Sequence, residues 1–181
     1  MKTRVITLSA ISASLCTIVL TLGTYFADFF DLFAVVFGPI LLCMPLYLDS
    51  PKGAFLAFLA SGILALLISG FNITNLVYVS YFSFFGFYPI IKYVSVMKRW
   101  KKVPYYLVCT IWFMLALIGI YYYYTAFLGL DFGLIIKVKE YLIPILLAVA
   151  SVPIYFLLDK FYFVAQISIF NLLKRVIKNK D

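Results

Sequence analysis

The sequence contains no histidine, only seven acidic residues, and no pair of cysteines with the spacing of a metal or redox motif. Without histidine the chain has no histidine-based acid–base catalyst, haem ligand or zinc ligand. The three cysteines, Cys16, Cys43 and Cys109, each lie within an apolar run, and such an odd set is not typical of a disulfide framework. No nucleophile–base pair and no phosphate-binding glycine loop is visible. The sequence therefore predicts a protein that is not an enzyme and that uses no metal or other cofactor.

Apolar residues dominate the composition of the chain. They make up 66% of the 181 residues, whereas a soluble domain is about half apolar. A membrane-spanning helix needs about 20 apolar residues, so six spans would use about 120 residues and leave no room for a separate soluble domain. We therefore predict an all-α integral membrane protein, a compact six-transmembrane-helix bundle forming a single domain over residues 1–181. The predicted spans are about 5–26, 30–48, 53–69, 76–96, 103–127 and 141–159, and residues 160–181 form a basic tail.

The basic residues predict how the chain is threaded. Lys98, Arg99, Lys101 and Lys102 follow the fourth span directly, and each cation costs about 2.5–3.5 kcal/mol in hydrocarbon. Because cytoplasmic loops carry an excess of lysine and arginine, this cluster is expected in the cytoplasm together with both termini. The net charge of +8 sits mostly at span ends. It therefore indicates contact with membrane lipids and not with nucleic acid.

The first span carries small residues in its first half. Its apolar run, residues 5–26, is longer than the core of a signal peptide and is predicted to be retained. The pairs Ser9/Ala13 and Ala10/Ser14 are four residues apart and so stack along the helix, where small side chains permit close helix approach. We predict that these four residues dock on a partner helix.

Proline and glycine interrupt two later spans. Pro39 lies at mid-depth in the second span, and Gly86 with Pro89 breaks the fourth. In the second span, Pro39 and Pro45 predict kinks, because proline removes a backbone hydrogen bond that neighbours must replace. Lys92, the one cation inside the fourth span, is predicted to snorkel toward the cytoplasmic cluster.

A candidate solute site lies at the outer ends of the spans. Asn72 and Asn75 occupy the turn before the fourth span, Tyr78 and Tyr81 follow it, and Lys137 and Lys139 lie in the long segment before the sixth span. Amides both donate and accept hydrogen bonds, tyrosine rings offer flat stacking surfaces, and a lysine pairs with an anionic group. The pattern predicts a pocket for a flat small molecule. The same residues are also explained by an interfacial aromatic girdle and ordinary turn chemistry.

The overall pattern resembles a known family. A chain near 180 residues with six spans, a basic start (Lys2-Thr3-Arg4) and the small-residue face Ser9, Ala10, Ala13 and Ser14 is similar to the substrate-binding S component of energy-coupling factor (ECF) vitamin transporters. Residues 84–92 also resemble a stretch found in uncharacterised Firmicute membrane proteins of this size. The resemblance implies a bacterial plasma membrane, a vitamin-like small-molecule substrate, and a coupling subunit with ATPases as partners. The family's first helix has an A-x-x-x-A motif, and here serine replaces one alanine in each pair.

A second class of protein fits the same pattern. The six-span cell-shape protein of the MreD type has a similar length and topology and acts as a scaffold without a solute. A structural subunit of another membrane complex is a third reading. No residue pattern here identifies a particular vitamin, so the substrate stays open.

Overall fold

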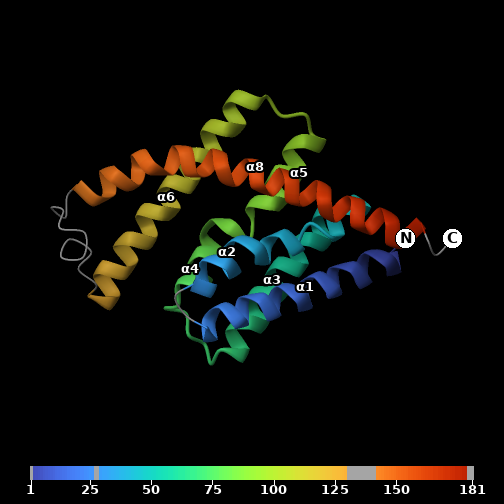
Figure 1. Cartoon of the computed structure of the whole chain (residues 1–181), viewed down its shortest axis with the longest axis horizontal. Helices are drawn as coiled ribbons and strands as arrows, with labels where there is room; N and C mark the ends of the chain where they lie inside the picture. The colour runs from blue at the N-terminus through green and yellow to red at the C-terminus, as the bar shows by residue number, and fades with distance from the viewer. Residues whose placement is uncertain (1, 27–28, 130–141, 179–181) are drawn as a thin grey trace. The chain divides into compact units, whose positions relative to one another are not determined.

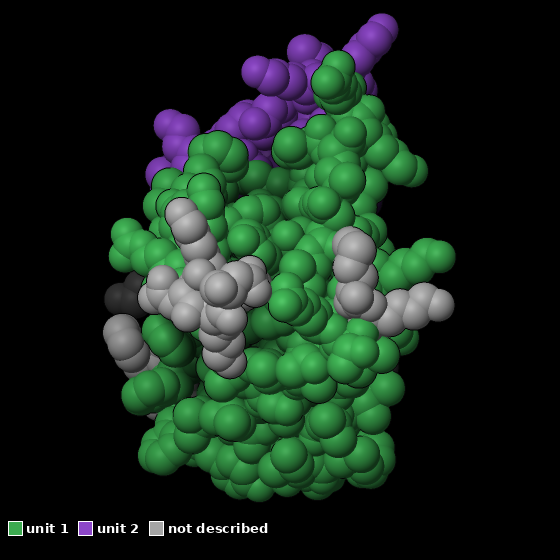
Figure 2. All heavy atoms as spheres, turned by 90° about the vertical axis from the view of Figure 1, so that its right-hand side faces the viewer, with its two compact units in different colours: residues 1–100, 162–181 green, residues 101–161 purple. Residues whose placement is uncertain are grey.

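The computed structural model of the chain describes residues 2–26, 29–129 and 142–178, and these residues are almost wholly helical, with no strand among them. The chain divides into two compact units, which are described separately here (Figure 2). Unit 1 comprises Met1–Trp100 and Tyr162–Asp181, and unit 2 comprises Lys101–Phe161. The elements are α1 (Lys2–Tyr25), α2 (Phe29–Leu41), the 3₁₀ turn η1 (Pro45–Leu48), α3 (Pro51–Ile68), α4 (Leu76–Ser80), the π-helical η2 (Tyr81–Phe85), α5 (Tyr88–Met97), α6 (Lys102–Leu128) and α8 (Ile143–Lys178) (Figure 1).

Five helical stretches are long and apolar enough to cross a membrane. They are Thr3–Tyr25, Phe30–Leu48, Pro51–Ile68, Lys102–Ala126 and Ile143–Val176. They match five of the six predicted spans, which confirms an all-helical chain with the character of a membrane protein. The fourth predicted span is not one continuous helix, so the complete six-helix bundle and the orientation of its termini remain predictions.

The fourth stretch is divided into α4, η2 and α5. Asn75 caps α4, because its Oδ1 accepts the N–H of Val77 at 2.8 Å. The N–H of Gly86 then donates to the carbonyl of Tyr81, five residues earlier, at 2.9 Å, which is the π-helical pattern. Pro89 is near the start of α5, where its missing N–H costs little. The fourth stretch is thus interrupted next to Gly86 and Pro89, where the sequence placed the break, but the interruption is a π-helical turn over Tyr81–Phe85 and not a hydrogen bond lost at proline.

In unit 1, α1 packs against both α2 and α3 (Figure 1). The hydroxyl of Ser12 donates to the carbonyl of Leu41 at 2.7 Å, which joins the early part of α1 to the end of α2. The hydroxyl of Tyr25 donates to the carbonyl of Ile68 at 3.2 Å, which joins the ends of α1 and α3. The helix α1 is therefore parallel to α3 and antiparallel to α2.

Proline positions explain where α2 ends and α3 begins. Pro39 lies within the last turn of α2, and the chain passes through a turn into η1, which starts at Pro45. Ser50 then caps α3 by accepting the N–H of Gly53 at 3.2 Å, with Pro51 at the first helical position, where its missing N–H costs little.

The second half of α8 belongs to unit 1. Tyr162 donates its hydroxyl to the carbonyl of Val36 at 3.1 Å, and its ring lies 5.5 Å from that of Tyr88. The sequence predicts that the sixth span ends at about residue 159 and that the tail after it is also helical, and in the structure the two form one helix that continues to Lys178. No glycine or proline occurs after Pro153 within α8, so Asp159 and Lys160 alone do not end it.

Unit 2 contains α6 and the first half of α8. Its ring contacts join the two helices: Tyr106 lies 5.8 Å from Phe156, and Phe113 lies 6.2 Å from Tyr155. Cys109 is buried in the same region. Few of the α6 side chains are buried and most of them are apolar, as expected for a helix that contacts lipid.

Candidate functional site

The turn that precedes α4 is polar and exposed. The hydroxyl of Thr74 donates to Asn72 Oδ1 at 2.8 Å, and Asn75 uses its own Oδ1 to cap α4. Phe71 has a φ of 60°, which is unusual for a bulky side chain, and is 63% exposed. Asn72 and Asn75 thus lie together, as the sequence predicted, with their side-chain oxygens engaged within the turn.

Tyr78 and Tyr81 lie beneath this turn, inside unit 1, and both are fully buried. The hydroxyl of Tyr78 donates to the carbonyl of Ala65 at 2.8 Å and lies 3.3 Å from the hydroxyl of Thr24. These bonds tie α4 to α3 and to the last turns of α1. Tyr78 therefore acts as an internal brace for the turn above it.

Tyr81 is the centre of a second set of contacts. Its hydroxyl lies 2.7 Å from the hydroxyl of Ser61 and donates to the carbonyl of Phe58 at 3.2 Å. The thiol of Cys16 also points to it, at 3.7 Å. The ring of Tyr81 packs 5.1 Å from that of Phe58. Sequence reasoning missed Ser61, Phe58 and Cys16 as partners, because nothing in their spacing relates them to residue 81.

The predicted lysines Lys137 and Lys139 lie outside the described residues. They remain sequence-based predictions. The described part of the candidate site is the Asn72–Asn75 turn with the two braced tyrosines below it.

The predicted docking face on α1 divides into two halves. Ala13 is buried, and Ser9 faces α3 so closely that a Cβ on Gly53 would lie 2.6 Å from its hydroxyl oxygen. Ala10 and Ser14 are exposed, and the hydroxyl of Ser14 donates back to the carbonyl of Ala10 at 2.9 Å. Within this chain, Ser9 and Ala13 permit close approach of α1 to α3, while Ala10 and Ser14 face outward.

Lys92 lies in the interior, and the predicted snorkelling does not occur. It is only 6% exposed, and its ammonium lies 6.0 Å from the ring centre of Tyr88 and 5.6 Å from that of Phe163. Aromatic faces attract cations, and the attraction is stronger where water is excluded. A buried cation in a membrane protein is a functional pointer, and its chain position just after the break in the fourth stretch was the available signal.

Comparisons with protein families, curated proteins and solved structures found no match for this chain.

Proposed function

We propose that the chain is the substrate-binding S component of an ECF-type transporter, which takes up a small vitamin-like solute across a bacterial plasma membrane. The proposal includes six membrane crossings, with α4, η2 and α5 together forming the fourth, and both termini in the cytoplasm. Its partners would be a coupling subunit with ATPases. The chain would supply solute binding and no catalysis.

The observation that carries the proposal is the interrupted fourth stretch. Non-helical backbone at membrane depth is tolerated only where protein or a water-filled cavity surrounds it. In many transporters, discontinuous helices form the solute site for this reason. Here the break at Gly86 lies among buried aromatic side chains, and the segment before it begins at the polar Asn72–Asn75 turn.

The amides of Asn72 and Asn75 are the proposed direct contacts for the solute. Within the turn, the hydrogen bonds of both side chains are made by their Oδ1 atoms, which leaves the two NH₂ groups as donors for a solute. Tyr78 and Tyr81 support this turn from below through their bonds to α3. Lys137 and Lys139 are retained as candidate partners for an acidic group on the solute, on sequence grounds.

Docking on the coupling subunit is assigned to the outward half of the small-residue face. Ala10 and Ser14 are exposed and small, so a partner helix can approach α1 closely there. Ser9 and Ala13 contribute to the same helix by holding α1 against α3.

The test is a thermal-shift screen of the purified full-length protein against water-soluble vitamins and their precursors. A ligand should raise the melting temperature, and the double variant Asn72→Ala/Asn75→Ala should weaken its binding at least tenfold, because a polar group left unpaired costs about 1–3 kcal/mol. Asn171→Ala, in the exposed last part of α8, is the matched control and should leave binding unchanged. The proposal fails if no compound raises the melting temperature.

A scaffold of the MreD cell-shape type is the second candidate. The full burial of Tyr78 and Tyr81, with both hydroxyls bonded inside the protein, favours it, because a scaffold needs a packed interior and no solute pocket. Affinity purification from the native membrane separates the two. ATPase and coupling subunits would support the transporter, whereas cell-wall proteins without a bound small molecule would support the scaffold.

A further inference from the structure

One end of unit 1 gathers basic side chains from four separate helix ends. They come from the first turn of α1, the start of α3, the residues just after α5, and the last turns of α8. We name this surface the basic end, and it consists of Arg4, Lys52, Lys98, Arg99, Lys174 and Arg175, all of which are exposed.

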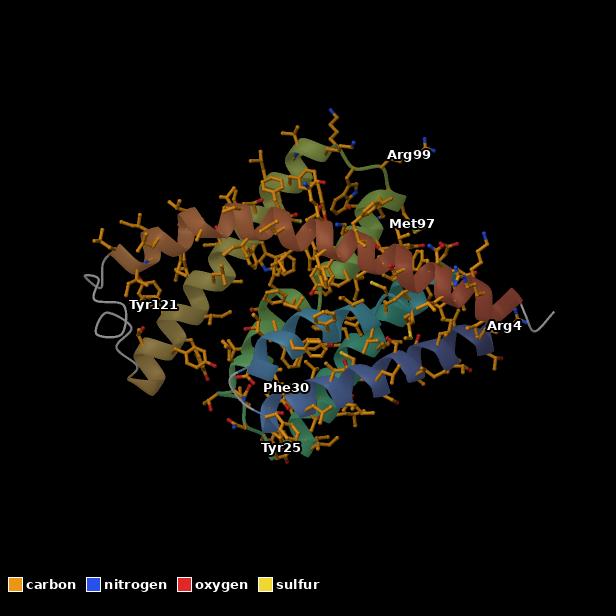
Figure 3. The ribbon with its side chains drawn as sticks, viewed as in Figure 1. Arg4, Tyr25, Phe30, Met97, Arg99 and Tyr121 are labelled. Atoms are coloured by element: carbon orange, nitrogen blue, oxygen red, sulfur yellow. The ribbon has the colours of Figure 1, made fainter. Side chains whose placement is uncertain are left out.

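Packing within unit 1 brings these helix ends to the same side. A Cβ on Gly53 would lie 3.2 Å from Val5, so α1 and α3 begin side by side. The ring of Phe170 in α8 lies 5.7 Å from Tyr47 and 6.4 Å from Tyr93, which joins α8 to η1 and α5 near their ends. Figure 2 views the molecule from this side, and Figure 3 shows Arg4 far from Tyr25 and Phe30, which lie at the other end of α1 and the start of α2.

Exposed apolar side chains lie among these cations. They are Val96, Met97, Trp100, Leu172 and Val176, each at least 49% exposed. A surface that faced only water, or a dissolved anion, would gain nothing from exposing these side chains. The boundary between lipid head groups and acyl chains suits both kinds of residue, because it offers phosphates to the cations and hydrocarbon to the apolar groups.

The backbone conformation of Arg99 is an independent indication that the positive charge of the basic end has a function. It ends α5 with a φ of 51°, and the N–H of Trp100 donates to the carbonyl of Ser95 at 3.0 Å. This left-handed position after a helix is normally occupied by glycine, because a Cβ there is strained. An arginine at this position keeps a cation at the surface despite the strain.

We propose that the basic end binds the phosphate groups of anionic phospholipids, with Trp100 and its apolar neighbours seated at the edge of the acyl chains. This inference is independent of the proposed transport function. The occupant is a lipid surface and not an acidic protein, because the exposed apolar side chains need hydrocarbon beside the charge.

Trp100 provides a built-in reporter for the test. The full-length protein carrying Trp112→Phe would be reconstituted in phosphatidylcholine bilayers that contain an equal fraction of either brominated phosphatidylglycerol or brominated phosphatidylcholine. Bromine quenches tryptophan on contact, so stronger quenching by the anionic lipid reports its enrichment at Trp100. The matched control is Trp100→Phe, which keeps Trp112 in α6, about 15 Å along the helix from Lys102.

We expect excess quenching by the anionic lipid at Trp100 and none at Trp112. The double variant Lys174→Gln/Arg175→Gln should lower the enrichment roughly 25-fold, since each cation near an anionic surface contributes about a factor of five and the two factors multiply. Arg99→Gly should lower it several-fold while the melting temperature stays equal or rises, because glycine removes the backbone strain. Raising sodium chloride to 0.5 M should abolish the excess.

Three outcomes would overturn the proposal. The first is equal quenching of Trp100 by the two lipids, which would leave the surface open to an acidic protein partner. The second is an excess that persists in Lys174→Gln/Arg175→Gln and in Arg99→Gly. The third is loss of the excess on adding inorganic phosphate at constant ionic strength, since this would identify a site for free phosphate.

Discussion

The hydroxyl groups of Tyr81 and Ser61 lie 2.7 Å apart in the interior of unit 1, where they join the start of η2 to the middle of α3. The pair holds the π-helical segment at the point where the fourth stretch departs from regular helix geometry. Irregular backbone at this depth depends on such bonds to neighbouring helices. The bond between Tyr81 and Ser61 therefore stabilises the interrupted fourth stretch, which is the feature that supports the proposed function.

Replacing Tyr81 with phenylalanine tests this bond. The variant keeps the ring packed on Phe58 but removes the hydroxyl, while Ser61 keeps its own bond to the carbonyl of Phe58 at 3.0 Å. We expect a loss of about 0.5–1.5 kcal/mol in the free energy of unfolding, measured by denaturation in mild detergent. The control Tyr122→Phe alters a 56% exposed residue of α6 and should change little. Equal stability of both variants would show that the bond contributes nothing.

Two glycines inside helices should respond to alanine with opposite signs. A Cβ on Gly23 would lie 2.4 Å from the Cβ of Ala34, and neither atom can move without its backbone. Gly23→Ala should therefore separate α1 from α2 and destabilise the protein by about 1–3 kcal/mol. Gly119 has no atom within 4 Å of its Cβ position, so Gly119→Ala should stabilise the protein by up to about 1 kcal/mol through helix propensity. A stabilising Gly23→Ala variant, measured in the same assay, would contradict the packing of α1 on α2.

The sequence was sufficient to predict the helical class, five of the apolar spans and the break at Gly86 and Pro89, because span length, proline and glycine act locally. It was not sufficient for Ser61, whose partner Tyr81 is 20 residues away on another helix. It also placed Lys92 near solvent, since distance to a charged cluster along the chain was the only guide. The aromatic side chains around it come from α5 and from Phe163, about 70 residues later, and no local pattern reveals that packing.

The small-residue face shows a related limit. A repeat of four residues predicts that Ser9, Ala10, Ala13 and Ser14 lie along one region of α1, but it does not say which half meets α3. The packing of Ser9 against Gly53 shows that Ser9 and Ala13 face α3, whereas Ala10 and Ser14 face away from it.

That distinction gives the third prediction. Ala13→Trp should destabilise the isolated protein, because Ala13 is 7% exposed and the larger ring has no room beside α3. Ala10→Trp should fold normally in detergent, because Ala10 is exposed, and should still block assembly with a coupling subunit. Size-exclusion chromatography measures folding, and co-purification with the partner measures assembly. Normal assembly of the Ala10→Trp variant would show that Ala10 and Ser14 do not form the docking surface.

The last prediction concerns the orientation of the chain in the membrane. In unit 1, the bond between Tyr25 and Ile68 places the ends of α1 and α3 together, at the opposite end from Arg4 and Lys52. The Asn72–Asn75 turn follows α3 at this far end, so it should lie outside if the cations lie inside.

Cysteine labelling of intact cells measures this orientation. In a background without Cys16, Cys43 and Cys109, Ile73→Cys should react with a membrane-impermeant reagent, because Ile73 is 58% exposed in the turn. Lys101→Cys, also exposed, should react only after the cells are permeabilised. Ile135→Cys, in the segment outside the described residues, is expected to behave like Ile73→Cys. Labelling of Lys101→Cys in intact cells, with protection of Ile73→Cys, would reverse the orientation. The amides of the proposed solute site would then face the cytoplasm, which is incompatible with uptake from outside.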